Sequence, residues 1–313
     1  MQQTNLAAID LGTNSCRLYI TDIQGKVLYH ESVTTKLGEG LHENGRFTTA
    51  AIERGLTCLA NFAKIMQQYN VVHYRAIATA SCRMADNGQA FIKTVSEMCD
   101  IKMEIIDSRE EALLNLKGSL ANAPKDKAYV LVYDLGGGST EITLATNEPE
   151  PKMLYTISIP WGARNASEAF DIIEYDSEKA RRLEQEIKGY AHAFKHDSEL
   201  LHYFNQCAYI ATSSTPLRLM SMLYNTGKYN REQADGMKAS TADLSRQIAA
   251  VEKMNFIELS QSPYIGENRA SVFIAACIIF KTIYDELQIP ELTASLKGAK
   301  EAMIEDLRQQ WQN

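Results

Sequence analysis

The sequence lacks paired cysteines, an apolar leader and a long hydrophobic run, and each absence excludes a class of protein. Its six cysteines form no Cys-x-x-Cys pair, which favours reduced thiols over a disulfide framework or a zinc site. The first residues, MQQTNLAAID, show no basic segment followed by an apolar stretch, so we expect no signal peptide. The longest apolar run, residues 272–280, is about half of the roughly 20 residues that a membrane span needs. We therefore expect a cytoplasmic protein without membrane contact.

Positive charge is also scarce. The chain has 32 basic and 39 acidic side chains, a net charge of −7, and such a surface repels polyanions. We therefore expect no nucleic-acid partner. An anionic substrate would need local arginines, backbone N–H groups or a divalent cation to reverse the field around it.

The length and the alternation of patterns predict two α/β domains. At about 150 residues per domain, 313 residues correspond to about two domains. Strand patterns alternate with helix patterns such as residues 49–68, whose apolar side chains recur at helical spacing. A polar segment with Pro124 follows the helix predicted over residues 110–120, so we place the boundary there. The expected domains are residues 1–124 and 125–313, and the last helix can pack back on the first domain.

Two segments of the second half carry further expectations. Residues 271–287 are apolar almost all round, so we expect a buried helix, and a helix of this kind is compatible with a homodimer. Residues 224–239 are polar and contain Gly227 and Gly236, so they predict a loop.

The strongest signal is a motif that occurs twice. Asp10-Leu-Gly-Thr-Asn-Ser15 and Asp134-Leu-Gly-Gly-Gly-Ser139 each follow an apolar strand pattern and precede a second one. Each motif therefore predicts a hairpin with a glycine-bearing tip, and the chain reads as two related halves. One such tip alone is better explained by an ordinary turn whose aspartate bonds to its own loop. Its recurrence favours a function.

Glycine-bearing tips suit phosphate. Without a Cβ the backbone can approach an anion closely, and successive N–H groups of a tight turn form a concave site for phosphate oxygens. An aspartate beside them repels phosphate, and carboxylates in such places usually hold Mg²⁺. The residues assigned to phosphate binding are Gly12, Thr13, Asn14, Ser15, Gly136, Gly137, Gly138 and Ser139.

The strings AAIDLGTNSCRLYI and VYDLGGGSTEI resemble the exopolyphosphatase and guanosine pentaphosphate phosphatase (Ppx/GppA) family. Further matches occur in the right order at residues 36–41, 78–83, 105–112 and 267–269. The resemblance covers nearly the whole chain and is to the short, two-domain form of the family. It implies the fold of the actin, Hsp70 and sugar-kinase superfamily, with two actin-like (ribonuclease H-like) domains flanking a central cleft.

The resemblance also implies a catalytic glutamate, and its motif places that residue at Glu111. A carboxylate there would orient or deprotonate the attacking water. The alternative is structural, because Ser108-Arg-Glu-Glu111 has the spacing of a helix capping box, in which Glu111 bonds back to the N–H of Ser108.

The other site residues follow from the same resemblance. Asp134 and Glu141 are assigned to catalysis and to the metal, with Asp10 as a third metal ligand and Mg²⁺ or another divalent cation as cofactor. Strand alternation can direct Glu141 toward the cleft, although a solvated strand residue is the alternative. A guanidinium suits phosphoryl oxygens, although a surface ion pair is the commoner role for any one arginine. The arginines assigned to the substrate are Arg17, Arg83 and Arg269.

Two segments depart from the family pattern. Where the family usually has a glycine-rich turn, this chain has Ala211-Thr-Ser-Ser-Thr-Pro216, whose hydroxyls can still cap a helix. Near the end, residues 295–301 lack the acid and the arginine of the family. Both changes bear on substrate grip, metal binding and activity.

The resemblance implies a hydrolase that releases terminal phosphate from inorganic polyphosphate, guanosine pentaphosphate or both, with Mg²⁺-assisted attack of water oriented by Glu111. The guanosine substrate would connect the protein to the stringent response. One alternative is an ATP-dependent kinase or ATPase of the same superfamily, because phosphate loops do not distinguish water from an alcohol as acceptor. The other is a nonenzymatic sensor of an alarmone or polyphosphate.

Overall fold

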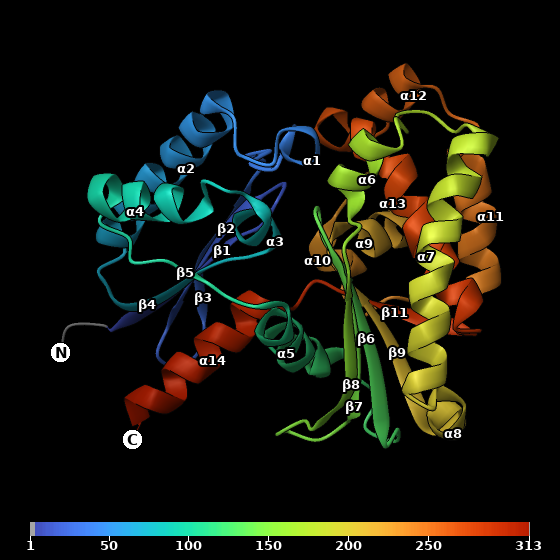
Figure 1. Ribbon diagram of the computed structural model, residues 1–313. Coiled ribbons are helices and arrows are strands. Elements are labelled where there is room, and N and C mark those ends of the chain that lie inside the picture. Colours follow the sequence, from blue (N-terminus) through green and yellow to red (C-terminus); the bar gives the residue numbers. More distant parts are fainter. Residues whose placement is uncertain (1–3, 313) are drawn as a thin grey trace. The chain divides into compact units, whose positions relative to one another are not determined.

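The computed structural model describes residues 4–312 of the chain, which form two compact units (Figure 1). The first unit contains the chain up to Leu114 together with the segment from Ala299 onward, and the second contains Asn115–Gly298. Each unit is organised around one β-sheet. No helix among the described residues is both long enough and apolar enough to cross a membrane.

Five strands form the sheet of the first unit: β1 (Asn5–Leu11), β2 (Cys16–Asp22), β3 (Val27–Val33), β4 (Val71–Ala78) and β5 (Glu104–Ile105). They lie in the order β3-β2-β1-β4-β5. The pairs β1–β2 and β2–β3 are antiparallel hairpins, whereas β4 runs parallel to β1. Parallel pairing needs a crossover connection, and the long helix before β4 belongs to that connection.

Helices surround this sheet: α1 (Leu41–Asn44), α2 (Thr49–Gln68), α3 (Ala80–Met84), α4 (Gly88–Cys99), the start of α5 (Ser108–Ser119) and α14 (Ala299–Gln312). Successive side chains of β1 point to opposite faces of the sheet, and a separate core covers each face. Ile9 shares one core with Phe62 of α2. Ala8 shares another with Met303 of α14. The expected helix over residues 49–68 is confirmed, and Thr48 caps its start.

Six strands form the sheet of the second unit: β6 (Tyr129–Leu135), β7 (Thr140–Thr146), β8 (Met153–Ile159), β9 (Cys207–Thr212), β10 (Lys238–Ser240) and β11 (Glu291–Ser295). Their order is β10-β11-β9-β6-β7-β8. The series β8-β7-β6-β9 repeats β3-β2-β1-β4 of the first unit, with two antiparallel pairs followed by a parallel one. The expected α/β architecture, built twice on the same hairpin, is therefore confirmed.

The helices of the second unit are α6 (Ala163–Ala169), α7 (Ser177–Asp197), α8 (Leu200–Tyr203), α9 (Ser214–Leu223), α10 (Arg231–Ala234), α11 (Thr241–Val251), α12 (Phe256–Gln261) and α13 (Glu267–Glu286). The second half of α5 also belongs here. Helix α13 is buried nearly all round, as its apolar sequence predicts.

The expectation of a plain loop over residues 224–239 is wrong in part. The segment contains α10, and β10 begins at its end. Asn230 starts α10 by accepting a hydrogen bond from the N–H of Gln233. Lys238 pairs with Thr293 at the edge of the sheet. Elements this short are less than two turns or two strand repeats long, so the sequence shows no periodicity for them. A side-chain cap forms the helix, and pairing with a neighbouring strand forms the strand.

Candidate active site

The first glycine tip is the turn between β1 and β2. The N–H of Gly12 donates to the carbonyl of Ser15 at 3.0 Å and closes the turn. The carbonyl of Thr13 accepts from the N–H of Gly38, in the segment matched at residues 36–41. A Cβ on Gly38 would lie 2.3 Å from Thr13 Cγ2, so a side chain there would have to displace the side chain of Thr13. The matched segment therefore supports the tip from outside.

The second tip, between β6 and β7, repeats this turn. The N–H of Gly136 donates to the carbonyl of Ser139 at 3.0 Å. The carbonyls of Gly136, Gly137 and Gly138 then accept hydrogen bonds from the start of α6, at distances between 2.8 and 3.2 Å. In a trans peptide the carbonyl and the following N–H point in opposite directions. The N–H groups of residues 137–139 therefore face away from α6, and neighbouring N–H donors in a turn are groups that can bind phosphate oxygens.

Helix α6 holds this tip through two residues that sequence reasoning missed. Asn165 donates from its side chain to the carbonyl of Gly138 at 2.9 Å, and its side-chain oxygen accepts from the N–H of Gly162 at 2.8 Å. A Cβ on Gly162 would lie 2.6 Å from Gly138 N. Asn165 supplies only one half of a capping box, because glycine has no side chain for the other half, so no capping signal in the sequence points to Asn165.

Glu111 lies in the first turn of α5, with its side chain largely buried. Arg83 Nη1 donates to Glu111 Oε2 at 2.8 Å and to the carbonyl of Ile106 at 2.9 Å. Burial raises the pKa of Glu111, and the positive charge of Arg83 opposes that rise without cancelling it. Asp107 caps the start of α5, because its side-chain Oδ1 accepts a hydrogen bond from the N–H of Glu110 at 2.8 Å. The carboxylate of Glu111 is bound by Arg83, so the capping-box alternative is wrong.

Asp10 and Arg17 form an ion pair in the first unit. They are register partners on β1 and β2, and Arg17 Nη1 lies 2.6 Å from Asp10 Oδ2. Both side chains are partly exposed. The guanidinium predicted to hold substrate thus contacts the carboxylate predicted to hold metal, and the two assignments stay predictions.

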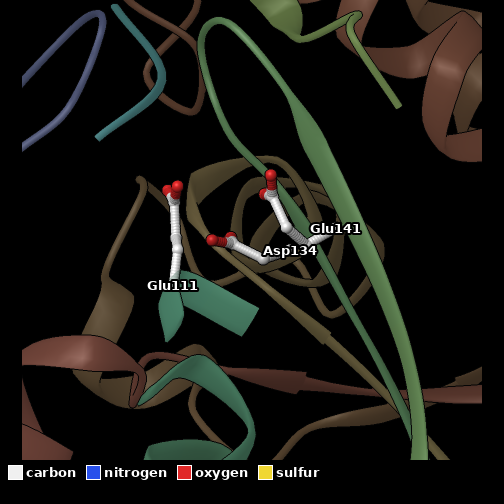
Figure 2. Close-up of side chains that lie close together, drawn as sticks. All are labelled: Glu111, Asp134 and Glu141. Carbon is white, nitrogen blue, oxygen red and sulfur yellow. The ribbon is translucent and has the colours of Figure 1, made fainter. Parts of the chain in front are cut away.

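Asp134 and Glu141 form the matching pair of the second unit. They are register partners on β6 and β7, and a carboxylate oxygen of one lies within 4.8 Å of an oxygen of the other. Figure 2 shows the side chains of Asp134 and Glu141 on these neighbouring strands. Asn115 donates to Asp134 Oδ2 at 2.7 Å, and Ser158 donates to Glu141 Oε1 at 2.8 Å. Two carboxylates oriented by neutral donors are a ligand set that fits Mg²⁺, which takes oxygen ligands.

The altered turn at residues 211–216 keeps the backbone of a glycine turn. Ser213 has φ 83° and ψ −171°, a region that is essentially reserved for glycine. Its Oγ donates to the carbonyl of Leu135 at 2.6 Å, directly before the second tip. Ser213 therefore adopts a backbone conformation that favours glycine, and its hydrogen bond to the end of β6 stabilises that conformation.

Arg269 lies in the first turn of α13. It is close enough to Tyr229 to act on the pKa of that phenol, as are Arg218 and Arg231. The guanidinium of Arg218 stacks over the Tyr229 ring at 3.9 Å. Arg269 thus belongs to a group of arginines around one tyrosine, and its assignment to substrate stays a prediction.

Curated relatives share sequence with large parts of the chain. A bifunctional 3-dehydroquinate synthase/phosphatase of Fusobacterium nucleatum is 30% identical over 294 residues, covering 89% of this chain and 43% of that protein. Exopolyphosphatase 2 of Mycobacterium tuberculosis is 34% identical over 160 residues, covering 47% of this chain and 50% of that protein. This chain thus matches half or less of the length of each of these relatives.

Solved structures share the fold. An exopolyphosphatase of Cytophaga hutchinsonii superposes with a TM-score of 0.84 at 23% identity, and the match covers 98% of both chains. A Ppx/GppA family member of Aquifex aeolicus superposes with a TM-score of 0.78 at 23% identity and the same coverage. These likenesses confirm the expected actin-like fold class.

A family model for the Ppx/GppA phosphatase family matches residues 20–310. This span contains the second glycine tip, Glu111 and both carboxylates of the β6–β7 pair. The sequence resemblance, the twice-built sheet and the family match agree, and the chain belongs to the Ppx/GppA phosphatase family.

Proposed function

We propose that the chain hydrolyses the terminal phosphoanhydride bond of inorganic polyphosphate or guanosine pentaphosphate. The observation that carries this proposal is the second tip. Three backbone carbonyls are bound by α6, so three N–H groups face the opposite way in the turn that joins the strands of Asp134 and Glu141. Fixed N–H donors are well suited to the charge that builds up on phosphoryl oxygens during transfer.

In the proposed reaction a water attacks the terminal phosphorus, the bond to the bridging oxygen breaks, and that oxygen leaves on the shortened substrate. Glu111 orients the water and accepts its proton. The raised pKa of Glu111 supports this role, because a carboxylate that binds protons more tightly is a stronger base. Arg83 supports it too, because its bond to Glu111 Oε2 fixes the carboxylate in one direction.

We place the cation on Asp134 and Glu141, with Asp10 as a third candidate ligand. A bound Mg²⁺ supplies positive charge that offsets the charge of the phosphates. We assign Glu111 to the attacking water at this centre because its motif matches that of the family's catalytic glutamate.

The test is phosphate release from polyphosphate, guanosine pentaphosphate and ATP, each measured with and without Mg²⁺. We expect release from one or both of the first two substrates, and a fall of about 10²–10⁴-fold in Glu111→Gln. Glu110→Gln is the matched control, because Glu110 is an exposed partner of Arg75 and should leave the rate unchanged. Full activity in Glu111→Gln would remove its assigned role.

Other outcomes of this assay would replace the proposal. ATP turnover that requires an alcohol acceptor would identify a kinase. Tight binding of guanosine pentaphosphate in a calorimeter, with no phosphate released over hours, would identify a sensor.

A further inference from the structure

Helix α5 packs unusually close to the turn before α14. A Cβ on Gly118 would lie 2.0 Å from the carbonyl oxygen of Gly298, so the two backbones touch where neither residue has a side chain. Ser119 adds a hydrogen bond from its Oγ to the carbonyl of Lys297 at 3.2 Å. The second half of α5 is therefore held against residues 297–298 at a fixed depth.

Asn115 lies one turn before Ser119 on the same face of α5. Asn115 is 8% exposed, and a Cβ on Gly298 would lie 2.8 Å from Asn115 Oδ1, so the side chain fills the space beside the turn. Its Nδ2 donates to Asp134 Oδ2 at 2.7 Å. Burying an amide costs free energy unless it is hydrogen-bonded, so Asn115 and Asp134 hold each other in one arrangement.

We propose that Asn115 is a positioning residue for the cation site, and this inference rests on the proposed function. Asp134 is the next-to-last residue of β6, and its carboxylate can rotate unless a donor fixes it. The amide of Asn115 fixes Oδ2 and thereby sets the direction in which the carboxylate faces Glu141 and the second tip. Hydrogen-bond partners of this kind hold ligands in place, and their loss typically lowers metal affinity about 10–100-fold.

The proposal is tested by titrating the purified full chain with Mn²⁺ and following the free ion by electron paramagnetic resonance. Asn115→Leu keeps the branched shape but removes the donor, and we expect Mn²⁺ to bind about 10–100-fold more weakly. Asn115→Ala, which is smaller, serves as a second variant in case leucine perturbs the packing of α5. Circular dichroism checks that each variant is folded.

The matched control is Ser119→Ala. It removes a hydrogen bond between the same helix and the same turn but does not touch Asp134. We expect Ser119→Ala to bind Mn²⁺ like the wild-type chain. If the substitutions at Asn115 and at Ser119 lower the Mn²⁺ affinity equally, Asn115 acts only through helix packing and the proposal is wrong.

Two further outcomes are decisive. Unchanged Mn²⁺ affinity in both folded Asn115 variants overturns the inference and leaves the proposed hydrolysis standing. A wild-type chain that binds no Mn²⁺ also overturns it, whereas phosphate release, measured separately, decides the proposed function.

Discussion

Replacing Gly162 by alanine should push α6 away from the second glycine tip. The added Cβ would lie 2.6 Å from Gly137 C and Gly138 N, whereas ordinary contacts begin at 3.4 Å. The neighbours are backbone atoms, so a displacement of about 0.8 Å must come from the tip or from the helix. The backbone angles of Gly162 (φ −128°, ψ −178°) suit any residue, so the effect is one of packing alone.

We expect two measurable effects from this displacement. Overpacking typically costs about 1–3 kcal/mol, which lowers the melting temperature by roughly 2–4 °C per kcal/mol in a unit of this size. A misplacement of about 1 Å can cost about 10²-fold in rate, so phosphate release should fall by up to that factor. Thermal unfolding followed by circular dichroism and the phosphate-release assay measure the two effects.

Gly189→Ala is the matched control for Gly162→Ala. Gly189 lies inside α7, and a Cβ there meets nothing within 4 Å. Alanine is the better helix former, so this variant should be more stable by about 0.5–1 kcal/mol with unchanged activity. If Gly162→Ala matched the wild-type chain in both assays, α6 would not be what holds the tip, and the N–H donor set would lose its support.

Three other variants test the strained turn and the buried acid. Ser213→Ala and Ser213→Gly both lose the hydrogen bond to the Leu135 carbonyl, but only glycine adopts the positive φ without strain. Ser213→Gly should therefore be more stable than Ser213→Ala by about 1–3 kcal/mol in urea unfolding. Equal stabilities of the two variants would argue against strain at this position. The folded-state pKa of Glu111 is raised, so its contribution to stability is present below its unfolded pKa and is lost as the pH rises through the folded value. The stability of Glu111→Gln relative to the wild-type chain should therefore increase from pH 4 to pH 7.5, and a constant difference across this range would contradict the shift.

The sequence predicts the fold and the glycine tips because both arise from local patterns. Alternating strand and helix signals give the two α/β units, and the repeated Asp-Leu-Gly motif gives the hairpins on which they are built. Each tip closes through the same hydrogen bond, from Gly12 to Ser15 and from Gly136 to Ser139. The conformation of a tight turn depends on residues that are adjacent in the chain, so the sequence alone predicts it.

The supporting residues could not be predicted, because their roles depend on distant parts of the chain. Asn115 stands at an ordinary helical position, and only the path of β6 brings Asp134 to its amide. Ser108 has the spacing of a cap, yet Asp107 performs that role and Arg83 takes the carboxylate of Glu111. Competing partners of this kind become visible only when the tertiary contacts are known.

The return of α14 to the first unit sets an order in which the molecule can be completed. Leu6 and Ala8 on one face of β1 share a core with Ala302 and Met303, nearly 300 residues later in the chain. The second unit is one continuous stretch, so during synthesis it can assemble as soon as it leaves the ribosome. The sheet that is made first must wait for the last helix to cover it, and its apolar face stays open to chaperones until then.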